Sequence, residues 1–245
     1  MIPSPRQSAA APTRPGCPSE QAISQRHGTA IWLLVAIAAT AQTGCTPVSS
    51  AATDAVKLLV SQHQNHAPTA ATVAALPYYQ LAASTRDGQA VLILGNVDGV
   101  REDWYGNNHV VVFLEHGQLT GTAGLLQNLD GLRQPANNPF TRGLQHLSVP
   151  TEYTYTVDWS PGYRYGVPVK ARFIPAGSAQ LEILGQVHGV LRIDEELDAP
   201  AAGWHATNHY WVDPADGFVW KSVQQIAPGL PITLLQLHPY RGQSS

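Results

Sequence analysis

The sequence predicts a mainly β protein whose antiparallel meander sheet folds on itself, barrel-like or sandwich-like, with a short N-terminal helix. Charged residues make up only 13% of the 245 residues, while Gly (21) and Pro (19) are plentiful, which favours strands and turns over solvated helices. From Tyr78 onward, short runs of β-branched and aromatic residues are separated by Gly, Pro, Asn or Asp every ~8–12 residues, as in antiparallel sheets. The third observation is an internal repeat within this part of the chain.

The composition also limits the possible partners. A hydrophobic content of 44% is sufficient for a globular core. The formal net charge is −3, and Lys and Arg are not clustered, so the positive surface that nucleic-acid binding needs is missing. We therefore do not expect nucleic acid as a partner.

The front of the chain, residues 1–45, has the pattern of an exported lipoprotein. Residues 1–29 are rich in Pro, Ser and Ala and are predicted to be disordered. Ala30–Ala41 is an apolar run, shorter than the roughly 20 residues that cross a bilayer but suited to a signal-peptide core. Gln42–Cys45 follows and resembles a bacterial lipobox, which predicts a diacylglyceryl group on Cys45. The alternative is ordinary secretory cleavage nearby, which would leave a soluble periplasmic protein.

Cysteine usage supports the lipid anchor. Cys17 and Cys45 are the two cysteines of the chain, so cleavage before Cys45 leaves no thiol for a disulfide, a metal site or a nucleophile. Thr46, rather than Asp, follows the cysteine, and by resemblance to such lipoproteins this indicates sorting to the outer membrane. The expected location is thus the periplasmic side of the outer membrane, with the bilayer as a partner through acylated Cys45.

Residues 46–77 are predicted to be a tether with a short helix, followed by a single β domain over 78–245. The helix is expected at Asp54–Gln64, from the spacing of its apolar residues, and a loop at 65–77. The longest loop of the domain is expected at Arg133–Ser148, near its midpoint. Strands are predicted at Ala90–Leu94, Val110–Glu115, Gln118–Thr122, Tyr153–Trp159, Val167–Ile174, Leu181–Val187, His209–Val212 and Phe218–Ser222.

Two segments of the β domain, near 90–130 and 180–232, resemble each other. Leu94–Val100 matches Leu184–Val190, and each copy continues with a Trp followed four residues later by Asn-His. Gly117 and Gly217 then stand at equal distance. Such repeats usually form supersecondary units that pack on each other, which predicts two pseudo-equivalent β halves.

The second copy and the residues behind it resemble the C-terminal signature of the YjbF/GfcB family. The motifs that carry the resemblance are Asn208–Gln224, Pro228–Pro231 and His238–Tyr240, together with Trp104, Gly117 and Thr122–Leu125 of the first copy. The resemblance covers about Tyr78 to Tyr240. It implies a many-stranded β-meander, a lipid anchor and involvement in group 4 capsule or exopolysaccharide production, and it implies no established catalytic residues.

The repeated Trp, Asn and His residues are the candidates for glycan contact. Indole rings stack on the C–H faces of sugars while neighbouring amide and imidazole groups bind hydroxyls. The alternative is that the Trp rings pack in the sheet core and that each Asn-His pair holds a turn. The candidates are Trp104, Asn108, His109, Trp204, Asn208 and His209.

Two other kinds of chemistry, metal binding and glycoside hydrolysis, have candidate residues in the sequence. His109, His205 and His209 suit zinc or copper, but on strands they need not converge, and we expect neither a metal nor any other cofactor. The acidic groups Glu102-Asp103 and Asp194–Glu196 resemble glycosidase carboxylates, although adjacent acids are usually a solvated face. No nucleophile elbow, phosphate loop or dinucleotide fingerprint is present.

Taken together, the sequence predicts a non-enzymatic lipoprotein that assists capsular or exopolysaccharide secretion by contacting the glycan or the export proteins. The alternative is a periplasmic enzyme, similar to a glycoside hydrolase, that modifies the polysaccharide through its loop carboxylates.

Overall fold

The structure is a computed structural model that describes residues 67–162 and 164–242, and these residues form a mainly β body. The strands are β1 Gln80–Thr85, β2 Gly88–Asp98, β3 Arg101–Tyr105, β4 Val111–Glu115, β5 Gln118–Ala123, β6 Asn128–Arg133, β7 Thr151–Ser160, β8 Arg164–Ile183, β9 Gln186–Ala199, β10 Trp204–Val212, β11 Val219–Ala227 and β12 Leu230–His238. The helices are α2 Ala70–Ala74 and α3 Pro139–Arg142, with 3-10 turns η1 Asn107–His109, η2 Leu144–His146 and η3 Pro200–Ala202.

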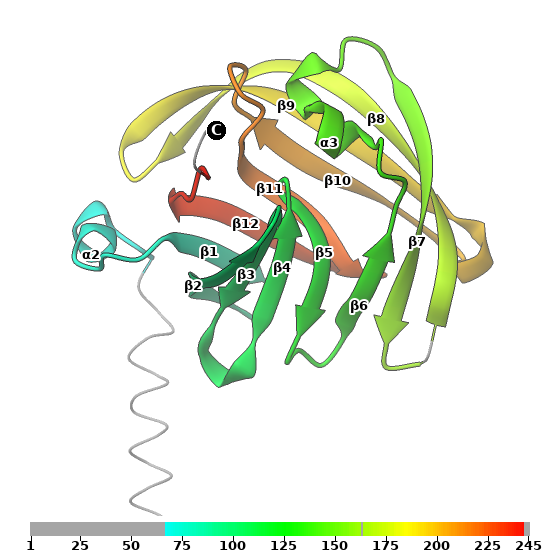
Figure 1. Cartoon of the computed structure of the whole chain (residues 1–245), viewed down its shortest axis with the longest axis horizontal. Coiled ribbons are helices and arrows are strands. Elements are labelled where there is room, and N and C mark those ends of the chain that lie inside the picture. Colours follow the sequence, from blue (N-terminus) through cyan, green and yellow to red (C-terminus); the bar gives the residue numbers. More distant parts are fainter. Residues whose placement is uncertain (1–66, 163, 243–245) are drawn as a thin grey trace, which may run out of the picture. The chain divides into compact units, whose positions relative to one another are not determined.

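All the strands belong to one 12-stranded antiparallel sheet that is nearly closed into a barrel, which confirms the predicted meander folded on itself (Figure 1). Strands that follow one another in the chain pair with one another, and β12 pairs with β1. The two edge strands are β5 and β6. Side chains join them, because Thr122 Oγ1 accepts from the Leu129 N–H (3.0 Å) and donates to Asn128 Oδ1 (3.2 Å).

The core lies on the inner face of the curved sheet. Alternate residues of each strand point inward, so Ile232 and Leu234 of β12 join Leu81 of β1 in one continuous apolar cluster. The β6–β7 connection adds to this cluster: Asn138 caps α3 by accepting from the Phe140 N–H (2.9 Å), and the Phe140 ring packs edge-on against Tyr210 of β10. The predicted long loop therefore carries a short helix that closes part of the interior.

A smaller apolar cluster lies on the outer face of β1 and β12. Val73 of α2 packs there with Ala82 and Leu237, and Leu184 from the β8–β9 turn joins them. Gln80 fixes α2 in place, since its Nε2 donates to the Val73 carbonyl (2.8 Å). No helix within the described ranges has both the length and the apolar character needed to cross a bilayer.

Two local predictions differ from the structure, and two others lie outside the described residues. Residues 70–74 are helical where a loop was expected, because Thr69 and Thr72 form a capping box. The predicted strand Leu181–Val187 is wrong: Leu184 and Gly185 have positive φ and form the β8–β9 turn. The leader with Cys45, and the helix predicted at Asp54–Gln64, lie outside the described residues.

The two repeat copies are equivalent only in part. Gly117 and Gly217 both have positive φ in tight connections between paired strands, β4–β5 and β10–β11. Leu94–Val100 runs from strand into turn, whereas Leu184–Val190 runs from turn into strand. The predicted equivalence of two β halves therefore does not extend to these segments, because the same short motif fits a strand end of either polarity.

Candidate functional site

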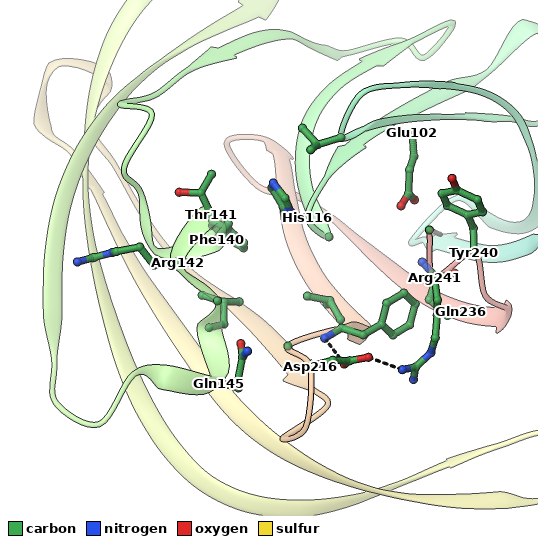
Figure 2. Close-up of a pocket in the computed structure, with 18 of the residues that line it drawn as sticks. Glu102, His116, Phe140, Thr141, Arg142, Gln145, Asp216, Gln236, Tyr240 and Arg241 are labelled. Carbon is green, nitrogen blue, oxygen red and sulfur yellow. Dashed lines mark hydrogen bonds and ion pairs between the residues drawn. The ribbon is translucent and has the colours of Figure 1, made fainter. Parts of the chain in front are cut away.

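A cavity of about 640 Å³ opens at one end of the curled sheet. We call it the end cavity. Connections from distant parts of the chain form its walls: the β2–β3 and β4–β5 turns, α3 with η2, the β10–β11 turn, the end of β12 and residues 240–242. Figure 2 shows side chains from these segments pointing toward a shared space. Its volume lies within the ~300–1,000 Å³ range of small-molecule sites.

Glu102 of β3 is the acidic side chain of one wall. Strand alternation places it on the inner face together with Trp104, whose Nε1–H donates to Glu102 Oε2 (2.9 Å). Burial raises the pKa of Glu102 from 4.5 to about 7, and the bond from Trp104 offsets part of that rise. Near neutral pH this carboxyl group therefore exists in both the acid and the carboxylate form.

The end cavity is also lined by an arginine whose charge is already paired. Arg241 donates to Asp216 Oδ2 (2.6 Å) and to Asp213 Oδ2 (3.1 Å). The bond to Asp216 is drawn as a dashed line in Figure 2. Its guanidinium also lies over the rings of Phe218 (4.6 Å) and Trp220 (4.7 Å). These contacts fix Arg241, and two carboxylates already share its positive charge.

Two buried carboxamide oxygens at the end cavity have no hydrogen-bond partner. Gln236 Oε1 belongs to a side chain on the inner face of β12 that is only 5% exposed, and Gln145 Oε1 comes from η2. The Gln145 group packs against Gly143 and Gly217, where a methyl group would collide with it. A buried acceptor without a donor costs about 1–3 kcal/mol, so both oxygens are suited to a ligand that donates hydrogen bonds.

The first group of predicted glycan residues is divided between the core and the surface. Trp104 is 0% exposed, so its ring packs in the sheet core, which was the alternative to stacking on a sugar. Asn108 and His109 are exposed in η1 with positive φ, between β3 and β4. Glycan contact by these residues stays a prediction, and Asn108 and His109 are the two that are open to solvent.

The second group is divided in the same way. Trp204 is buried, with its ring edge-on to Trp159 at 5.3 Å. Asn208 is buried and accepts from the Gln225 N–H (3.0 Å), whereas His209 is half-buried on the other face of β10. The six predicted residues therefore do not lie in one place, and their role in glycan contact remains a prediction.

Strand alternation also separates the two acidic groups. Asp103 lies on the opposite face of β3 from Glu102, where Arg101 Nε donates to it (2.8 Å). In the second group, Glu195 points into the interior and is 0% exposed, while Asp194 and Glu196 point outward. Neither group is a loop of adjacent carboxylates, because both lie on strands whose neighbours face opposite sides.

Glu195 takes part in a buried polar network rather than in a cleft. Its Oε2 accepts from the Tyr210 hydroxyl (2.7 Å) and from Asn208 Nδ2 (2.8 Å). Burial raises the pKa of Glu195 to about 7, and these hydrogen bonds limit the rise. Gln224 extends the network, because its Oε1 accepts from Tyr210 (3.2 Å) and from the Leu119 N–H of the edge strand β5 (2.8 Å).

Two of the candidate metal ligands, His205 and His209, each contact a different carboxylate of the neighbouring strand β9. His205 Nδ1 lies 3.0 Å from Asp198 Oδ1, and His209 Nδ1 lies 2.8 Å from Asp194 Oδ1. In residues 67–162 and 164–242, no three His, Cys, Asp or Glu side chains form a group that could hold a metal ion.

Sequence reasoning named Glu102 but missed Gln145, Gln236 and Arg241. A signal for Gln236 was present, since it follows Ile232 and Leu234 at alternate positions and is thus a polar residue on an inward-facing row. Nothing local in the sequence marks Gln145 or Arg241, because their positions depend on how the turns meet.

Comparisons with known proteins agree with this fold. A family model described as "Group 4 capsule polysaccharide lipoprotein gfcB, YjbF" matches residues 53–237. The crystal structure of the "hypothetical lipoprotein YmcC" from Escherichia coli is similar with a TM-score of 0.65 and 21% identity, over 77% of this chain and 96% of that one. A Bacteroides fragilis protein described as having a YmcC-like fold gives a TM-score of 0.31 and 8% identity, over 65% of this chain and 93% of that one. No curated protein matches the chain.

Proposed function

The chain belongs to the YjbF/GfcB family of group 4 capsule polysaccharide lipoproteins, and from this we propose that it assists capsular or exopolysaccharide secretion by non-catalytic contact with the glycan. Contact with export proteins is part of the same proposal. The single observation that supports glycan contact is the end cavity, whose lining includes the unpartnered oxygens of Gln236 and Gln145 and the carboxyl group of Glu102.

The geometry favours binding over hydrolysis. Glycoside hydrolysis needs two carboxyl groups about 5–10 Å apart, one as acid and one as base or nucleophile. Glu102 suits the acid, because its pKa of about 7 keeps a proton available at neutral pH. Asp216, which also lines the cavity, is paired with Arg241 at 2.6 Å, so this carboxylate is not free to act as base or nucleophile. Without a free second carboxylate, the end cavity is better suited to holding a sugar than to cleaving it.

Hydrolysis remains the second candidate, supported by Glu102 alone. The purified protein and its Glu102→Gln variant would be incubated with capsular polysaccharide, and chain length followed by size-exclusion chromatography. We expect no shortening with either protein. Shortening by the unchanged protein that the variant loses would replace the binding proposal with an enzymatic one.

The proposed location is the periplasmic side of the outer membrane, with Cys45 acylated; a soluble periplasmic protein is the alternative. One acyl chain gives only marginal membrane binding, so stable anchoring needs a second acyl chain or another contact with the bilayer. Lipoproteins meet this requirement through several acyl chains. Cys45→Ser is expected to move the protein from the membrane fraction to the soluble fraction after cell lysis. Membrane association unchanged in this variant would reject the anchor.

The direct test of glycan contact is recovery from an envelope extract. The full lipidated chain in mild detergent would be immobilised, and the retained glycans and proteins identified by composition analysis and mass spectrometry. We expect capsular or exopolysaccharide, alone or with export proteins. Recovery of neither would reject the proposed function.

A further inference from the structure

The end cavity presents hydrogen-bond acceptors that lack donors. Gln236 Oε1 and Gln145 Oε1 are buried without a partner, and Glu102 accepts from Trp104 through Oε2. Hydroxyl groups donate to such oxygens. A hydroxyl also accepts from an amide NH₂, so it satisfies either orientation of the glutamine carboxamides. A hydroxyl-rich ligand therefore fits the needs of the buried groups on both walls.

The charges of the end cavity disfavour an anion. Arg241 is shared between Asp213 and Asp216, and together these three side chains carry a net negative charge. Arg142 of α3 also lines the cavity, but Figure 2 shows its guanidinium pointing away from Glu102 and Gln236. An acidic sugar near Glu102 and Asp216 would meet carboxyl groups, with Arg241 already paired and Arg142 turned away, and like charges in a partly buried site repel strongly.

The end cavity also has aromatic and aliphatic lining residues. Phe140 and Leu144 reach the end cavity from the core, and Tyr240 also lines it. Sugar rings combine a hydroxyl edge with a C–H face that packs on aromatic rings. The combination of acceptors and rings matches an uncharged sugar unit better than an ion.

We infer that the end cavity binds uncharged sugar units through their hydroxyl groups and discriminates against units that carry a carboxylate. This inference rests on the proposed glycan contact and specifies its ligand class and its residues. Gln236 acts as a specificity-determining acceptor, since it is the most deeply buried of the unpartnered groups at the site.

The experiment compares two probes that differ only at C6: methyl α-D-glucopyranoside, with a CH₂OH group, and methyl α-D-glucuronide, with a carboxylate. Binding to the full lipidated chain in detergent would be measured by saturation-transfer NMR at pH 7.5. The test variant is Gln236→Leu, which puts an apolar side chain of comparable volume in place of the carboxamide and so removes the acceptor. The matched control is Gln89→Leu. Gln89 is exposed near the start of β2, whereas the cavity is lined by the end of that strand at Val97.

We expect the neutral glycoside to bind at least ~10-fold more tightly than the glucuronide, and Gln236→Leu to weaken its binding about 2–10-fold, as for the loss of one hydrogen bond. The variant should unfold at the same or a higher temperature, because it removes a buried acceptor that lacks a partner in the free protein. Gln89→Leu should bind like the unchanged protein.

Equal or tighter binding of the glucuronide, or unchanged binding by Gln236→Leu, would overturn the inference. Failure of both probes to bind would also overturn it, and the proposed function would survive that result if polysaccharide or export proteins are recovered from the envelope extract. If neither probe binds and neither polysaccharide nor export proteins are recovered from the envelope extract, the inference and the proposed function are both rejected.

Discussion

Replacement of the buried Glu195 by Gln should make the protein more stable at alkaline pH. Glu195 is fully buried on the inner face of β9, and its Oε1 has no hydrogen-bond partner. Gln has the same shape, still accepts from Tyr210 and Asn208 through its carbonyl oxygen, and carries no charge at any pH. The substitution therefore removes the cost of ionising a carboxyl group inside the sheet.

The size of the effect follows from the raised pKa of Glu195. An ordinary value of 4.5 in the unfolded chain and about 7 in the folded protein differ by an amount equivalent to about 3 kcal/mol. Below pH 4.5, both states hold the proton and stability is complete. Between pH 4.5 and 7, the unfolded state loses the proton first, so stability falls by about 1.4 kcal/mol per pH unit. Above pH 7, the loss is complete and constant.

The assay is urea unfolding followed by tryptophan fluorescence at pH 5 and pH 8. The free energy of unfolding of Glu195→Gln, relative to that of the unchanged protein, should be about 2–3 kcal/mol higher at pH 8 than at pH 5. The raised pKa of Glu102 acts in the same direction in both proteins and cancels in the comparison. Glu196→Gln is the control, since its exposed pair with Arg172 is worth less than ~1 kcal/mol. Parallel pH profiles for the unchanged protein and Glu195→Gln would refute the reasoning.

Three further substitutions test the contact between β11 and β5, the wall of the end cavity and one turn. Gln224→Ala should destabilise the protein by at least about 1–3 kcal/mol in urea unfolding, because the Leu119 N–H loses its acceptor; an unchanged midpoint would contradict this role. Trp104→Phe removes a donor to Glu102, so the pKa of Glu102, followed by carboxyl NMR, should rise further above its ordinary value, and a fall would count against the contact. Gly124→Ala should cost more than ~1 kcal/mol, since Gly124 has a φ of +79° and a methyl group there would collide with backbone; wild-type stability would show that the turn can adjust.

The sequence carried the strand content and much of the strand pairing. Runs such as Val110–Glu115 and Gln118–Thr122 flank a Gly turn, and both ends of that hairpin are encoded within a dozen residues. The prediction failed at Leu181–Val187, where a non-Gly residue takes positive φ in the turn. Such a conformation is uncommon for Leu and has no local signal in the sequence.

The candidate site was predicted less completely, because it depends on which face each strand residue occupies. Glu195 and Asp194 are adjacent and chemically similar, yet one is buried beside Tyr210 and the other binds Arg192 on the outside. A shift of one residue in the register would exchange their faces. Both were candidate acids from the sequence, and the sequence pattern did not show which of the two faces the interior.

Local patterns by themselves determined that the chain forms a meander of short strands, and the motifs near its C-terminus pointed to its family, because alternation and turn residues act over a few positions. Only the tertiary structure decided that Glu102 and Gln236, more than a hundred residues apart, share one cavity while the repeated tryptophans Trp104 and Trp204 fill the core. The physical reason is that closing β12 onto β1 brings distant turns to the same end of the sheet, and the curvature sets which side chains are enclosed.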